Sequence, residues 1–184
     1  MIVKKEKRNS RKRPTFVLLV AISIDGKITN GTKEGNGWTS KEDKRIFHQE
    51  LDRCDVAVMG RKTFEAIERP LTPRNRIVFS MQKTFSRSSE CEHVIPGDVR
   101  SLNRLIQKNA WGRIAIVGGT QVYDWFLEHD LIDEMYITIE PVIFGSGRPF
   151  TDTYHSLQKR FTLVSSKKLN KDDTLLLHYT ITHS

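Results

Sequence analysis

Cysteine is scarce in this chain, because its 184 residues include only Cys54 and Cys91. They form no CxxC pair, and no histidine pair accompanies them at metal-ligand spacing, so the sequence argues against a disulfide scaffold and against a metal ion. Long apolar runs are missing too. None approaches the roughly 20 residues that cross a bilayer, and the first residues lack the apolar core of a signal peptide. We therefore expect a cytoplasmic protein with reduced, buried thiols and no membrane span.

Acidic charge is also in short supply, since the formal net charge is +8 at pH 7. Most of the basic excess lies in the first 13 residues, which leaves the rest of the chain close to neutral. A basic segment without interleaved aromatic residues is weak evidence for nucleic-acid binding. We expect residues 1–13 to form a disordered basic tail and residues 14–184 to form one domain, because this length suits a single hydrophobic core.

Short apolar runs and amphipathic segments alternate along the chain after the tail. This alternation predicts an α/β fold with a mainly parallel central sheet and helices on both of its faces. The last two runs flank the turn NKDD and predict an antiparallel hairpin at one edge. The expected strands are residues 15–22, 55–59, 75–80, 113–117, 134–142, 161–169 and 173–181, and the expected helices are residues 40–54, 61–68, 99–109 and 121–129.

Glycines stand at two of the expected strand-to-helix junctions. In IVGGTQVYDWF, Gly118 and Gly119 either form a tight turn that needs positive φ, or let a phosphate-bearing cofactor approach bare backbone. In MGRKTFEAI, Gly60 is followed by basic residues at a helix start, where cations oppose the helix dipole and therefore favour an anionic partner. The chain has neither GxGxxG nor a P-loop motif. Together the junctions favour a dinucleotide held by a fold other than the Rossmann fold.

Asp43, in the segment WTSKEDKRIF, is a candidate catalytic acid. On a helix it shares one face with Ile46, Phe47 and Glu50, so its carboxylate lies beside apolar side chains. Two interpretations remain open. Asp43 is either a first-turn acid that complements the helix dipole, or a pocket carboxylate that hydrogen-bonds a heterocycle and helps to deliver a proton to it.

Several motifs together resemble known reductases. WTSKEDKRIF, MGRKTFEAIERPLTPRNRIVFS, IVGGTQVYDWF and MYIT occur in the order and approximate spacing of dihydrofolate reductases. AISIDGKI, WTSKEDKRIFH and LIDEMYITIEPVIFGSGRPF resemble the reductase domain of riboflavin biosynthesis, which shares that fold. His48, and Thr120 in place of a third glycine, depart from the dihydrofolate reductase pattern. The resemblance spans residues 15–181 and implies a dihydrofolate reductase-like three-layer fold.

This resemblance implies an NADPH-dependent oxidoreductase that transfers hydride to a C=N or Schiff-base carbon of a pyrimidine or pterin. The preferred substrate is the 5-amino-6-(5-phosphoribosylamino)uracil of riboflavin biosynthesis, and dihydrofolate is the alternative. It also implies a possible homodimer. An alternative of another class is a basic-tailed nucleic-acid-binding module on an inactive reductase fold, and a third is a nucleotide-binding protein without catalysis.

The resemblance also implies roles for individual residues. Asp43 corresponds to the pocket acid and Thr138 to its hydrogen-bond partner, with Trp38 and Phe47 as walls of the substrate pocket. Arg74 aligns with the arginine that receives the folate tail, although it also fits a surface arginine. The implied NADPH contacts are Ala21 and Ile28 at the nicotinamide, Arg61, Lys62 and Thr63 at the 2′-phosphate and pyrophosphate side, Ser80 at the adenosine, and Gly118, Gly119, Thr120, Gln121, Val122 and Tyr123 at the double glycine, where an unusual cis peptide bond is expected.

Overall fold

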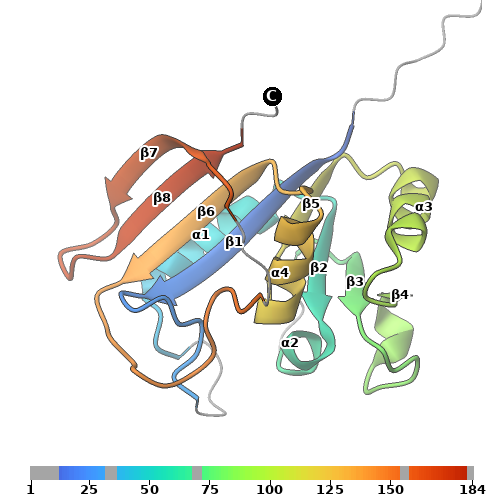
Figure 1. Cartoon of the computed structure of the whole chain (residues 1–184), viewed down its shortest axis with the longest axis horizontal. Coiled ribbons are helices and arrows are strands. Elements are labelled where there is room, and N and C mark those ends of the chain that lie inside the picture. Colours follow the sequence, from blue (N-terminus) through green and yellow to red (C-terminus); the bar gives the residue numbers. More distant parts are fainter. Residues whose placement is uncertain (1–12, 32–36, 68–71, 154–157, 182–184) are drawn as a thin grey trace, which may run out of the picture.

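One eight-stranded sheet forms the centre of the molecule (Figure 1). The computed structural model describes residues 13–31, 37–67, 72–153 and 158–181. The strand order is β4 (Glu92–Val94), β3 (Arg76–Phe79), β2 (Val56–Gly60), β5 (Arg113–Ile116), β1 (Thr15–Ser23), β6 (Glu134–Glu140), β8 (Leu175–Thr180) and β7 (Thr162–Lys168).

The sheet is parallel from β4 to β6 and antiparallel at its other end. β8 runs antiparallel to both β6 and β7, so the predicted C-terminal hairpin is confirmed. Its turn is held by Asn170, whose Oδ1 accepts a hydrogen bond from the Thr174 N–H at 3.1 Å. The sheet therefore combines a parallel centre, which needs cover on both faces, with an antiparallel margin.

Helices cover the sheet on both faces (Figure 1). α1 (Lys41–Leu51) and α2 (Arg61–Glu65) lie on one face, and α3 (Val99–Asn109) and α4 (Thr120–Glu128) lie on the other. Successive residues of β1 point to opposite faces, so Phe16 and Leu18 join one apolar core while Val17 and Leu19 join the other. This double burial explains why the β1 segment is an uninterrupted apolar run.

The structure departs from the predicted elements mainly at their ends. Asp55 precedes β2 instead of starting it, because its carboxylate accepts the backbone N–H groups of Gly112 and Arg113 at 2.7 and 2.9 Å. The helix predicted for residues 61–68 ends at Glu65, and residue 68 lies outside the described residues. β4 and a 3-10 helix at Ser88–Glu90 were not predicted, since three residues are too few to show a period.

The predicted tail lies almost wholly outside the described residues. Only Arg13 is described, and its guanidinium lies 3.3 Å from the Asp133 carboxylate. Of the two free thiols, Cys54 is buried but Cys91 is partly exposed, which corrects the expectation that both are buried. Within the described residues, no helix is long and apolar enough to cross a membrane, and no cluster of His, Cys, Asp and Glu could hold a metal ion.

Candidate active site

Two adjoining hollows lie at the carboxyl ends of the parallel strands, where ligands of open α/β sheets bind. A cavity of about 180 Å³ lies between α1 and the strands β1 and β6. A wider cleft of about 720 Å³ lies between α2, the end of β3 and the start of α4. Thr63 and Gly119 line both, so the two hollows meet at these residues. A ligand with two chemically different ends fits this arrangement.

Asp43 is a buried acid of the cavity, with a relative exposure of 8%, as is Glu50 with 7%. It lies in the first turn of α1, which Ser40 caps by accepting the Asp43 backbone N–H at 3.1 Å. Burial raises the pKa of the Asp43 carboxyl above its ordinary range, and the nearby Glu140 charge adds to this, while hydrogen bonds with Thr138 and Thr39 oppose it. A carboxyl of this kind takes up a proton more readily than an exposed aspartate.

Glu140 is a buried acid behind the site that the sequence reasoning missed. It is buried at 4% exposure. One of its oxygens accepts the Ser40 backbone N–H at 2.7 Å, and the other accepts the Thr174 hydroxyl at 2.7 Å. Glu140 therefore ties the start of α1, and with it Asp43, to the sheet. The sequence signal that could have identified Glu140 is the alternation along β6, which places Tyr136, Thr138 and Glu140 on one face of the strand.

Aromatic and apolar side chains wall the cavity. Trp38 packs edge-on against Phe144 with ring centroids 5.0 Å apart. Tyr123 also lines this cavity, and its hydroxyl donates to the Leu19 carbonyl at 2.9 Å. Tyr123 was expected at the cofactor phosphates, but it does not line the cleft, because this bond holds its ring over β1.

The cleft is lined by cations and by no carboxylate among the described residues. Arg61 is half-buried and pairs with Glu65 at 2.8 Å, whereas Lys62 and Arg148 are exposed. The hydroxyl of Thr120 donates to the Pro149 carbonyl at 2.6 Å. Sequence reasoning missed Arg148, since nothing in GSGRPF indicates that it faces a helix start almost 30 residues earlier. The lining as a whole favours an anion.

The double glycine separates the two hollows. Its peptide bond is cis, as the resemblance implied. Gly118 has φ +120°, and a Cβ there would lie 3.3 Å from the Tyr123 hydroxyl, so the backbone itself requires glycine. Gly119 has φ −91°, and within 4 Å a Cβ there would meet only the Thr63 hydroxyl, at 3.8 Å. Neither the φ of Gly119 nor contact with residues other than its chain neighbours calls for a glycine there, and the space beside it is open.

All but one of the predicted site residues line these hollows. Ala21, Ile28, Trp38, Asp43, Phe47, Gly118, Tyr123 and Thr138 line the cavity, Arg61, Lys62, Ser80, Thr120, Gln121 and Val122 line the cleft, and Thr63 and Gly119 line both. Arg74 is exposed and lines neither, because it lies in the loop before β3, at the amino end of that strand, whereas the hollows lie at the carboxyl ends. Five further polar residues of the cavity were not predicted as site residues, namely Thr29, Thr39, Lys44, Glu50 and Tyr136.

Comparison with known proteins shows the family to which the chain belongs. Residues 14–175 match the family model of the RibD C-terminal domain. The chain belongs to this family. The uncharacterized protein YwjB of Bacillus subtilis (strain 168) is 31% identical over 182 residues, covering 89% of this chain and 95% of YwjB. The dihydrofolate reductase of Buchnera aphidicola is 28% identical over 152 residues, covering 82% of this chain and 85% of that enzyme.

Solved structures confirm the dihydrofolate reductase-like three-layer fold. A pyrimidine reductase-like protein from Corynebacterium diphtheriae superposes with a TM-score of 0.78 at 16% identity, covering 93% of each chain. The diaminohydroxyphosphoribosylaminopyrimidine deaminase/5-amino-6-(5-phosphoribosylamino)uracil reductase of Thermotoga maritima superposes with a TM-score of 0.74 at 19% identity. This match covers 94% of this chain and 58% of the Thermotoga protein.

Proposed function

We propose that this RibD-family domain is an NADPH-dependent reductase that transfers hydride to a C=N or Schiff-base carbon of a pyrimidine or pterin. The observation that carries the proposal is the position of Asp43. It is a buried carboxyl with a raised pKa, in a cavity that joins a cationic cleft at Thr63 and Gly119. A protonatable acid next to a dinucleotide-sized anion site suits reduction of a nitrogen heterocycle.

The cleft residues fit NADPH. Arg61 and Lys62 supply positive charge for a 2′-phosphate, and the space beside Gly119 admits a pyrophosphate close to the backbone. Ala21 and Ile28 line the cavity beyond this point, where they would flank the nicotinamide. When bound, NADPH supplies the hydride.

The cavity residues position the substrate and supply its proton. Asp43 in its protonated form would donate to a ring nitrogen, and Thr138 and Thr39 orient the carboxyl through their hydrogen bonds. Trp38 and Phe47 would hold the heterocycle between apolar surfaces and exclude water. The raised pKa matters because a carboxyl with an ordinary pKa would carry almost no proton at neutral pH.

The preferred substrate is 5-amino-6-(5-phosphoribosylamino)uracil, and dihydrofolate is the second candidate. The family match and the reductase activity named for the Thermotoga protein support the first. The similarity to the Buchnera dihydrofolate reductase supports the second. The position of Arg74 favours the pyrimidine, because the arginine expected to receive the folate tail lines neither hollow.

A side-by-side assay tests the proposal. NADPH oxidation is measured with the ribosylaminopyrimidine phosphate and with dihydrofolate, using the wild-type chain and Asp43→Asn. We expect turnover of the pyrimidine that depends on Asp43. Turnover of dihydrofolate alone would support the second candidate. NADPH binding without turnover of either compound would contradict a reductase acting on these substrates and support a non-catalytic nucleotide-binding protein.

A further inference from the structure

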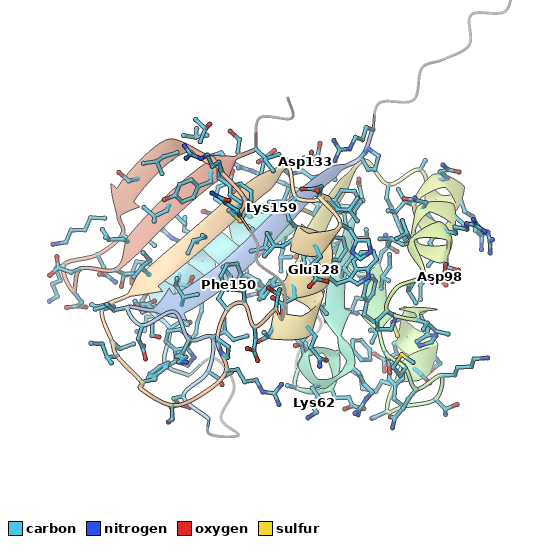
Figure 2. All side chains as sticks on the ribbon, in the orientation of Figure 1. Lys62, Asp98, Glu128, Asp133, Phe150 and Lys159 are labelled. Atoms are coloured by element: carbon cyan, nitrogen blue, oxygen red, sulfur yellow. The ribbon has the colours of Figure 1, made fainter. Side chains whose placement is uncertain are left out.

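The segment that follows β6, residues 141–150, crosses the cofactor side of the molecule and is here called the strap. In Figure 1 it is the orange segment that leaves β6, passes the end of β1 and returns to α4. Phe150 lies beside α4 at the end of the strap, with its ring centroid 5.3 Å from that of Tyr123 (Figure 2). The strap thus brings residues that follow β6 back to the start of α4.

Backbone hydrogen bonds fix the strap on both sides of Arg148. The Ile28 N–H donates to the Arg148 carbonyl and the Phe150 N–H donates to the Gly26 carbonyl, both at 2.8 Å. At the other end, the Asp25 carboxylate accepts the Gly145 N–H at 2.8 Å. A hydrogen bond from the Ser23 hydroxyl, together with those from the Phe144 and Gly145 N–H groups, lowers the pKa of Asp25 to about 2, so the carboxylate stays charged at neutral pH. The backbone of Arg148 is therefore placed without help from its side chain.

The Arg148 side chain is available to bind a ligand. It is exposed and makes no ion pair or hydrogen bond with any described residue, whereas Arg61 on the same cleft pairs with Glu65. The next residue, Pro149, accepts the hydroxyl of Thr120, which is the first residue of α4. α4 begins without a side-chain cap, and its first turn and Arg148 both line the cleft, so the positive end of the helix dipole and the arginine contribute to the same anion-favouring surface.

We propose that Arg148 binds the pyrophosphate of the dinucleotide. Arg61 and Lys62 lie on α2, across the cleft, and are left for the 2′-phosphate. The assignment follows from the bond between Pro149, the residue after Arg148, and the first residue of α4, which follows the open space at Gly119. The inference rests on the proposed cofactor. It divides the cations of the cleft into one that any dinucleotide uses and two that select NADPH.

Binding of fragments separates the two roles. We titrate three ligands calorimetrically into the full chain at low salt: NADPH, ADP-ribose and 2′-AMP. ADP-ribose has the pyrophosphate but no 2′-phosphate, whereas 2′-AMP has the 2′-phosphate but no pyrophosphate. We expect Arg148→Ala to weaken NADPH and ADP-ribose roughly ten-fold and to leave 2′-AMP unchanged, because a charge-assisted bond is lost. Lys62→Ala should weaken NADPH and 2′-AMP but not ADP-ribose. Arg148→Lys should restore part of the affinity, since it keeps the charge without the forked geometry.

The matched control is Arg160→Ala, which removes an exposed arginine that lines neither hollow and should leave all three affinities unchanged. An unchanged melting temperature of Arg148→Ala would show that the strap is intact. If that variant binds ADP-ribose as tightly as the wild type, or loses only 2′-AMP, the inference is overturned. A wild-type chain that does not bind NADPH would instead refute the proposed cofactor itself.

Discussion

The protonation of Asp43 is the residue-scale feature on which the proposed catalysis depends. Folding raises its pKa, so the native state favours the protonated form, and stability is lost as pH rises through the folded-state pKa. Asp43→Asn mimics that form. We expect it to raise the melting temperature at neutral pH, with the gain disappearing in acid. Turnover should fall about 10²–10⁴-fold while NADPH still binds, and this loss should shrink at lower pH, where solvent protonates the substrate.

Glu42→Gln is the matched control for Asp43→Asn, since Glu42 lies in the same first turn. The pKa of Glu42 is lowered, chiefly by its hydrogen bond with Asn170, so its charge stabilises the native state above its unfolded pKa. We expect Glu42→Gln to lower the melting temperature slightly and leave turnover unchanged. If Asp43→Asn behaves in this way too, Asp43 is only a helix-start acid.

Gly119 is the second residue with a decisive test. Its φ of −91° and the open space around it allow an alanine without strain, so Gly119→Ala should keep the melting temperature of the wild type. We expect NADPH affinity to fall roughly ten-fold or more, because the added methyl group occupies the space of the pyrophosphate. Gly112→Ala, whose Cβ would also meet nothing closer than 3.8 Å, is the control that should bind normally. If Gly119→Ala binds NADPH as tightly as the wild type, the double glycine serves only as a turn.

At the scale of elements, the strap contacts residues of both the cavity and the cleft. Phe144 packs on Trp38, and Pro149 bonds to Thr120. Gly147 has φ +112°, and a Cβ there would lie 1.9 Å from the Thr29 carbonyl oxygen, so Gly147→Ala must displace the strap. We expect a loss of about 1–3 kcal/mol in the free energy of unfolding, and weaker NADPH binding.

Gly145→Ala is the matched control for this element. Gly145 also has positive φ, +68°, but a Cβ there would meet nothing within 4 Å. Thermal melting should show a smaller loss, about 1–2 kcal/mol, from the left-handed conformation alone, and cofactor titration should show little change. Equal effects of the two substitutions on NADPH affinity would contradict the claim that the strap positions Arg148.

At the scale of the whole molecule, the question is whether the basic tail has a function separate from the two hollows. Both hollows are lined by residues after 18, and Arg13 is already paired with Asp133. We therefore expect deletion of residues 1–12 to leave NADPH affinity and melting temperature unchanged. Filter binding to RNA and DNA over a range of salt tests the alternative. A steep salt dependence that disappears on deletion would favour the nucleic-acid-binding module.

The predicted homodimer is checked by sedimentation of the wild-type chain and of the chain that lacks residues 1–12.

Local pattern was enough to predict the class of fold. The apolar run of β1, the alternation of strand and helix and the NKDD turn depend on short-range periodicity, which is visible in one dimension. β4 was missed because a three-residue strand has no period and exists only through its pairing with β3. The resemblance supplied the candidate site residues, and all of them line the two hollows except Arg74, which lies in the loop before β3.

The sequence by itself determined that Asp43 shares a helix face with Phe47 and that two glycine junctions end parallel strands. Only the tertiary structure decided what these features mean. Asp43 is a pocket acid because β6, about 95 residues later, buries it and places Thr138 and Glu140 beside it. Arg148 joins the cleft because the strap folds back onto Gly26, Ile28 and Thr120. The burial and raised pKa of Asp43 and the position of Arg148 in the cleft arise from contacts between segments that are distant in the sequence, so no local pattern predicts them.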